Sequence, residues 1–206
     1  MAKIESKDSC LRDILKDELY YQIPIYQRPY QWTEENCEKL LDDLFFNYED
    51  DRESDYFCGS LVLIAISEGS KAKIYDIVDG QQRLSTFILL AKVLATLYSE
   101  RLTEESKDYL QESLISKYGK KDRLNFNAIG FNSKKDFQYA LKFFDDLDAS
   151  KGENSKSNDP SKGKNRYLKN AICLKDYLEK KRLQTLTISL DGCILRSYLS
   201  KPLAPT

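Results

Sequence analysis

Apolar residues recur along this chain with two periods, which predict where helices and strands lie. The clearest helical pattern runs from Gln82 to about Tyr98, where apolar residues are spaced three and four positions apart. Weaker forms of this spacing predict further helices over residues 11–15, 34–48, 103–118, 133–147 and 165–181. We therefore expect the second half of the chain to be mostly helical.

Short β-rich runs predict the strands. Residues 61–66 form a continuous apolar run, which is typical of a strand covered on both faces, so we expect the central strand there. A turn at residues 67–70 is predicted to return the chain antiparallel to it as a hairpin. The remaining strands are expected at residues 19–23, 73–78, 123–126 and 183–190. Strands and helices together predict an α+β fold.

Length and composition predict how the chain is divided. With 206 residues, 41% of them hydrophobic, it can bury one core and carry a helical extension. Residues 148–163 are rich in Ser, Asn, Lys and Gly and are expected to be a mobile loop between two helices. We therefore predict a first domain over residues 1–100, a helical extension over residues 101–190, and a tail over residues 191–206.

The sequence also predicts the compartment. No apolar stretch approaches the roughly 20 residues of a membrane helix, and the first residues lack the apolar run of a signal peptide. We expect a cytoplasmic protein without a membrane partner. Five cysteines without a C-x-x-C pair favour reduced thiols over a disulfide framework or a zinc site; they are Cys10, Cys37, Cys58, Cys173 and Cys193.

The absence of histidine narrows the possible chemistry. It excludes Ser-His and Cys-His nucleophile pairs and histidine-dependent nuclease centres within this chain. The net charge is −1, but residues 34–55 carry ten acids against two bases, and residues 117–182 carry seventeen bases against nine acids. This asymmetry fits either solvated helix faces or a basic half that lies along nucleic-acid phosphates.

The segment Asp79-Gly80-Gln81-Gln82-Arg83 lies where a predicted strand passes into a helix. Free N–H groups and the positive end of the helix dipole would meet an anion there. Gly80 permits close approach, Arg83 can bind a phosphate, the two glutamines can orient oxygens or a base edge, and Asp79 could hold Mg²⁺. A purely structural turn, with Arg83 paired to a carboxylate, is the alternative. No G-x-x-x-x-G-K-[ST] sequence is present, which excludes an ordinary P-loop.

Residues 23–32 form a second unusual segment, with two prolines, three aromatic residues and an arginine. They predict an ordered, extended loop. Tyr26, Tyr30 and Trp32 could simply pack on the core. Alternatively, Arg28 is a second phosphate ligand and an aromatic ring stacks on a base, which requires this loop to lie beside residues 79–83.

Three motifs together resemble the N-terminal domain of GmrSD-type restriction endonucleases. They are Ile23-Pro24-x-Tyr26-Gln27-Arg28-x-Tyr30-x-Trp32, Phe57-x-Gly59-Ser60-Leu61 and Val78-Asp79-Gly80-Gln81-Gln82-Arg83-Leu84-Ser85-Thr86. The match is specific through about residue 97. The resemblance implies a ParB/sulfiredoxin-like fold, a small mixed sheet with packed helices followed by a mainly helical extension. It also implies binding and hydrolysis of a nucleoside triphosphate with Mg²⁺, in defence against phage carrying modified DNA.

Carried over onto this sequence, the implied nucleotide site consists of Arg28, Asp79, Gly80, Gln81, Gln82 and Arg83. We expect catalytic roles for Asp79, Gln82 and Arg83, and a Mg²⁺ ligand in Asp79. The expected supporting residues are Tyr26, Gln27, Tyr30, Trp32 and Thr86.

Family members commonly continue into a nuclease domain of the His-Me finger type, which needs a histidine. This chain has none, and the expected pattern stops near residue 190, so we predict a truncated copy that licenses a nuclease located elsewhere. Three alternatives remain open. They are a non-enzymatic DNA-binding module, an inactive remnant, and a sulfiredoxin-like redox enzyme, although residues 79–86 contain no cysteine for the last of these.

Overall fold

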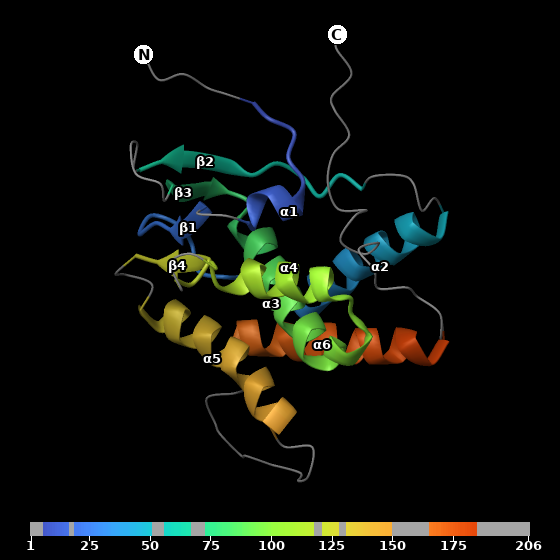
Figure 1. The fold of residues 1–206 in the computed structure, drawn as a ribbon. Coiled ribbons are helices and arrows are strands. Elements are labelled where there is room, and N and C mark those ends of the chain that lie inside the picture. Colours follow the sequence, from blue (N-terminus) through green and yellow to red (C-terminus); the bar gives the residue numbers. More distant parts are fainter. Residues whose placement is uncertain are drawn as a thin grey trace.

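A computed structural model of the chain describes residues 6–16, 19–50, 56–66, 73–117, 121–127, 131–149 and 165–184. Its elements, labelled in Figure 1, are α1 (Leu11–Ile14), β1 (Leu19–Ile23), α2 (Glu34–Asp50), β2 (Val62–Ala65), β3 (Lys73–Asp79), α3 (Gln81–Leu97), η1 (Ser99–Arg101), α4 (Glu104–Leu114), β4 (Leu124–Phe126), α5 (Phe131–Ala149) and α6 (Arg166–Gln184).

The four strands form one mixed sheet in the order β2-β3-β1-β4. Strand β1 is parallel to both of its neighbours, with Tyr21 opposite Tyr75 on one side and opposite Leu124 on the other. Strand β2 is antiparallel to β3, as expected for the predicted hairpin. The predicted α+β class is therefore confirmed.

The predicted central strand is wrong, because β2 lies at the edge of the sheet. Its side chains are largely exposed, with Val62 at 46% and Ile64 at 54% of their full surface. The central position belongs to β1 and β3, whose residues Tyr21 and Ile77 are buried. An unbroken apolar run is typical of strands with two covered faces, but it equally describes an apolar edge strand, and periodicity cannot separate the two.

Helix α3 occupies the centre of the helical layer. It packs against α4, α5 and α6, while α6 also packs against α2. Leu84, Ile88, Leu90 and Val93 are nearly inaccessible to solvent, and burying each such side chain stabilises the fold by about 1.5–3 kcal/mol. One hydrophobic cluster joins residues from both sides of the predicted boundary near residue 100, and that boundary stays a prediction.

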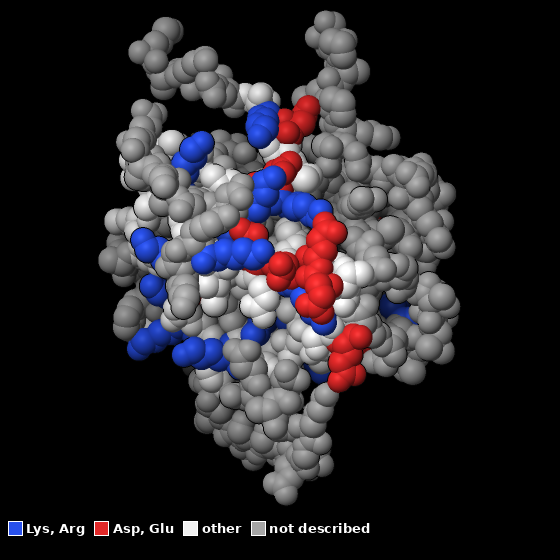
Figure 2. All heavy atoms as spheres, viewed as in Figure 1, with Lys and Arg blue, Asp and Glu red and all other residues white. Residues whose placement is uncertain are grey.

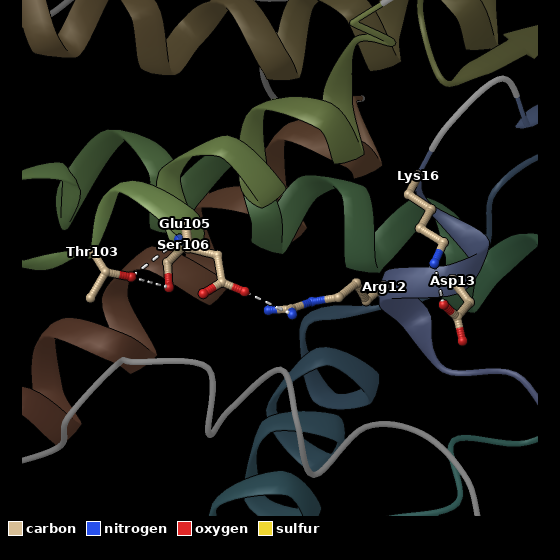
Figure 3. A network of polar contacts seen from close by, with 6 residues as sticks. All are labelled: Arg12, Asp13, Lys16, Thr103, Glu105 and Ser106. Carbon is tan, nitrogen blue, oxygen red and sulfur yellow. Dashed lines mark hydrogen bonds and ion pairs between the residues drawn. The ribbon is translucent and has the colours of Figure 1, made fainter.

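An exposed ion pair links α1 to the capped first turn of α4, as shown in Figure 3. Arg12 Nη1 donates to Glu105 Oε1 over 3.1 Å, which joins α1 to the first turn of α4. Thr103 caps that turn, because its hydroxyl oxygen accepts from the Ser106 N–H at 3.2 Å. The ion pair joins residues 93 positions apart, whereas the cap is local to the start of α4.

Charge is unevenly placed on the face seen in Figure 2. Acidic side chains gather over α4, and basic side chains gather near the beginning of α5 and the edge at β4. Helix α4 carries Glu104, Glu105, Asp108 and Glu112, and α5 carries Lys134 and Lys135 in its first turns. The acidic residues that gather on this face belong to α4 and not to the acid-rich residues 34–55 of the sequence.

Several predictions fall partly outside the described residues. Of the predicted loop, residues 148 and 149 belong to α5 and residues 150–163 are not described; of the predicted strand, residues 183 and 184 belong to α6 and residues 185–190 are not described. The predicted tail, residues 191–206, also lies outside the described part. Among the described helices, none is sufficiently long and apolar to cross a bilayer.

Candidate functional site

The turn between β3 and α3 depends on Gly80. Its φ of 94° lies in the left-handed region, which side-chain-bearing residues rarely adopt. A Cβ atom there would lie 2.8 Å from Leu61 Cδ1 and 3.1 Å from the Ser60 carbonyl oxygen. Only glycine therefore satisfies both the backbone conformation and the close approach of the Ser60–Leu61 main chain.

The first turn of α3 has neither a side-chain cap nor an acidic residue, and Gly80 occupies its N-cap position. The first N–H groups of a helix have no acceptor within the helix, and the dipole places partial positive charge on them. The donors expected from the sequence are the N–H groups of residues 81–83, and their use by an anion stays a prediction.

Arg83 is the third residue of α3, and its guanidinium lies over Gly59. A Cβ atom on Gly59 would approach Arg83 Cζ to 3.0 Å. Arg83 Nη2 donates to the Ser60 carbonyl oxygen and lies 3.6 Å from Asp79 Oδ2. Its side chain keeps 31% of its surface exposed, and among the described residues neither Nε nor Nη1 has an acceptor. Arg83 thus retains donors toward solvent.

Gln81 and Gln82 face the protein rather than solvent. Gln82 Oε1 accepts from the backbone N–H groups of Gln31, at 2.8 Å, and Trp32, at 3.3 Å. Gln81 Nε2 donates to the carbonyl oxygen of Arg28 over 2.8 Å. Both side chains are buried, so they tie the extended loop to the first turn of α3.

The extended loop is anchored at several further points. Gln27 Nε2 donates to the Val78 carbonyl oxygen over 2.6 Å, and the hydroxyl groups of Tyr30 and Thr86 share a buried hydrogen bond of 2.7 Å. The Tyr30 ring also stacks on Tyr167 of α6 at 4.3 Å between centroids. The predicted proximity of this loop to residues 79–83 is therefore present.

The aromatic residues of the loop have different environments. Tyr30 is buried, and burial raises its pKa far above the ordinary tyrosine value. Trp32 packs partly against the core, and its carbonyl oxygen accepts from Asn170 at 2.9 Å. Tyr26 is exposed. Tyr30 and Trp32 thus have the packing role that one interpretation expected, whereas the Tyr26 ring is open to solvent.

Arg28 joins the site through its main chain. Its carbonyl oxygen is held by Gln81, beside the first turn of α3. Its side chain is exposed and makes no hydrogen bond or ion pair with the residues that the structure describes. Convergence of the Arg28 and Arg83 guanidinium groups on one anion stays a prediction.

Cys58 is a neighbour of this site that the sequence did not reveal. A search for cysteine within residues 79–86 finds none, but the fold brings Cys58 close enough for the Arg83 charge to act on its thiol. Burial raises the pKa of Cys58 to about 12, and the positive charge of Arg83 lowers it by less. The thiol is therefore protonated at neutral pH, which opposes redox chemistry by a thiolate.

Acidic groups around the turn are sparse. Within the described part of the chain, no group of three or more His, Cys, Asp or Glu side chains could hold a metal ion. Asp79 contributes a single, well-exposed carboxylate. A separate groove of about 650 Å³ lies between α2 and α6 and contains none of the predicted site residues.

Comparison with known proteins agrees with the motifs. The family described as GmrSD restriction endonuclease, N-terminal domain, matches residues 11–200 of this chain. No curated protein matches it in sequence. The matched span includes the extended loop, residues 57–61 and the turn at residues 79–83, so the resemblance found from these motifs is confirmed.

Proposed function

The chain belongs to the family of GmrSD restriction endonuclease N-terminal domains, and on this premise we propose that residues 79–83 bind the phosphates of a nucleoside triphosphate and promote its hydrolysis. The observation that carries the proposal is the state of Arg83. Its guanidinium lies at the uncapped start of α3, fixed on one side and with Nε and Nη1 unengaged among the described residues.

Phosphate binding would use charge and backbone donors together. Arg83 supplies charge-assisted hydrogen bonds, and the N–H groups at the start of α3 add donors aligned with the helix dipole. Gly80 permits the positive φ of the turn and the close approach of Ser60 and Leu61, which together set the position of the first turn of α3. Arg28, with its exposed side chain, is proposed as the second cation. Such fixed donors stabilise charge that develops during phosphoryl transfer.

Asp79 is proposed to direct Mg²⁺ or the attacking water. Mg²⁺ is usually held by one or two carboxylates together with substrate phosphates and water, so a single exposed carboxylate fits this role once nucleotide is bound. The ion would supply neutralisation of phosphate charge. Asp79 also lies near Arg83, which keeps the carboxylate beside the phosphate ligands.

Gln81 and Gln82 are proposed to act by holding the extended loop, residues 23–32, against residues 79–83, which we call the phosphate turn. Both side-chain amides form hydrogen bonds with the main chain of the loop. Gln82 would therefore serve catalysis by holding the loop in place rather than by contacting the phosphate. Gln27, Tyr30, Trp32 and Thr86 support the same loop through the contacts described above. The exposed Tyr26 ring is the proposed stacking surface for the base.

The proposed biological role is to license a nuclease that acts on foreign DNA. Because the chain contains no histidine, nuclease chemistry of the His-Me finger type must come from another polypeptide region or subunit. Nucleotide binding and hydrolysis would then control when that nuclease acts.

A thermal-shift titration with ATP, GTP, CTP and UTP, each with Mg²⁺, tests the proposal. A ligand at a hundredfold excess over its Kd stabilises the folded state by roughly 2.7 kcal/mol, which is readily visible. We expect one or more nucleotides to raise the Tm of the wild type and none to raise that of Arg83→Ala. Arg12→Ala is the matched control, since Arg12 contacts Glu105 rather than the phosphate turn. A wild type that no nucleotide stabilises would overturn the proposal.

DNA binding without catalysis is the second candidate, and the basic region near β4 and the start of α5 favours it. Binding that depends on Lys134 and Lys135 should weaken steeply with salt, since each phosphate contact adds about 0.9 to the slope of log K against log salt. A Lys134→Glu/Lys135→Glu variant that binds duplex DNA as well as the wild type would remove this region from consideration.

A further inference from the structure

Two glycines with positive φ lock the phosphate turn to the segment before β2. Gly59, with φ +96°, and Gly80, with φ +94°, come from parts of the chain about 20 residues apart. The space beside each glycine is filled by residues next to the other one. Leu61 and Ser60 fill the space beside Gly80, and the Arg83 side chain fills the space beside Gly59.

The contact at Gly59 is made with the face of the guanidinium. Three of its atoms surround the position that a Cβ on Gly59 would take, with Cζ at 3.0 Å, Nε at 3.2 Å and Nη1 at 3.3 Å. Nearly equal distances to three atoms of one plane mean that the plane faces the glycine. Ser60 then fixes one edge of that plane, because its carbonyl oxygen accepts from Nη2.

This arrangement sets the direction of the remaining donors. With one face against Gly59 and Nη2 on Ser60, the guanidinium cannot rotate freely, so Nε and Nη1 have defined directions before any ligand arrives. Donors fixed in advance lose less conformational entropy on binding than a mobile side chain does. A structural pair between Arg83 and Asp79 alone would need neither Gly59 nor the Ser60 carbonyl.

We propose that Gly59 and the main chain of Ser60 are positioning residues for the phosphate site, which orient the Arg83 guanidinium toward a bound nucleoside triphosphate. The inference rests on the proposed function and extends it to residues 59 and 60. Gly59 acts by lacking a Cβ, and Ser60 acts through its carbonyl oxygen, so the Ser60 hydroxyl is dispensable.

Nucleotide affinity of five variants tests this, measured by isothermal titration with the Mg²⁺–nucleotide that stabilises the wild type. Gly59→Ala adds a Cβ against the guanidinium and should raise Kd roughly tenfold to a hundredfold. Gly59→Asn adds the same Cβ but tolerates the left-handed backbone better, so it protects the test against misfolding of the alanine variant. Ser60→Ala keeps the carbonyl oxygen and is the matched control, expected to bind within about twofold of wild type.

The last two variants, Arg83→Lys and Arg83→Lys/Gly59→Ala, separate an effect that acts through Arg83 from general backbone strain. Lysine lacks the planar face that rests on Gly59, so in an Arg83→Lys background the change at residue 59 should alter Kd much less than in the wild type. Equal losses in both backgrounds, or wild-type affinity in both folded Gly59 variants, would overturn the positioning role. A wild type that binds no nucleotide would instead overturn the proposed function.

Discussion

Two arginines in this molecule occupy opposite kinds of environment. Arg123 has 0% of its surface exposed, and Nε and Nη2 donate to the Glu112 carbonyl oxygen at 3.1 and 2.6 Å. Its Nη1 donates to the carbonyl oxygens of Leu19, at 2.5 Å, and Lys16, at 3.3 Å. Arg83 is partly exposed and is bound to the protein through Nη2.

The difference separates an arginine whose donors are all used by the fold from one that keeps donors exposed. Glu112 lies in the last turn of α4, whose carbonyl groups have no partner within the helix, so Arg123 caps α4 while joining it to the chain before β1. Every nitrogen of Arg123 is engaged in this structural work, whereas Arg83 keeps donors available. Engagement of the donors, rather than residue type, distinguishes the two roles.

Replacing Arg123 is expected to have the largest effect and would test the structural half of this comparison. Arg123→Met leaves three buried or part-buried carbonyl oxygens without their donor, at about 1–3 kcal/mol for each unsatisfied group. We expect a loss of more than about 3 kcal/mol in the free energy of unfolding, measured by urea denaturation.

Arg83→Met is the counterpart of that variant. We expect it to cost less than about 1 kcal/mol of stability, because the Asp79 pair is exposed and the Ser60 carbonyl can bind water. Equal losses for the two methionine variants would show that the comparison fails.

Gln82 provides an intermediate case that sharpens the comparison. Gln82→Ala leaves the N–H groups of Gln31 and Trp32 without their acceptor and should cost about 1–3 kcal/mol. Gln81→Ala removes one bond to an exposed residue and should cost less. Urea denaturation measures both losses, and limited proteolysis should cut the extended loop faster in the Gln82 variant. A larger loss for Gln81→Ala would contradict the assigned contacts.

Asp136 gives the smallest expected effect and extends the comparison to a half-buried acid. Burial raises the pKa of its carboxyl group, so the folded state favours the protonated form. This contribution is present below the ordinary pKa of about 3.9 and is lost as pH rises through the raised value. Asp136→Asn should therefore be slightly more stable than wild type at pH 7, with the difference vanishing below about pH 4. Urea denaturation at both pH values measures the stability difference between the two proteins. A difference that stays the same at both pH values would contradict burial as its cause.

Local pattern predicted much of the fold and the main turn of the site. The apolar spacing of α3, the hairpin of β2 with β3 and the strand–glycine–helix order at Asp79 to Gln81 all follow from neighbouring residues. Thr33 directly precedes α2, and its N–H donates to the Asn36 side-chain oxygen at 3.0 Å. Such features are encoded within a few positions, so one sequence is sufficient to predict them.

Contacts between distant segments could not be predicted in the same way. The edge position of β2 depends on which strand pairs with β1, and no periodicity records that choice. Three contacts join positions more than 20 residues apart. They are the burial of Gln82 against residues 29–32, the packing of the Arg83 guanidinium on Gly59, and the proximity of Cys58 to Arg83. The polar motif therefore predicted the strand–turn–helix position of the candidate site, but not which of its side chains face the protein.

The pairing of β1 with β4 has a consequence for how the polypeptide is made. Ile23 lies opposite Phe126, about 100 residues later, and parallel pairing over such a separation is slow to form. At about 5–20 residues per second, a ribosome needs roughly 5–20 s to deliver β4 after β1. During that interval the edge of β1 that later pairs with β4 has no partner strand, and Arg123, which later donates to Leu19, has not yet been synthesised. Chaperone binding to the growing chain should therefore be concentrated before residue 126 leaves the ribosome.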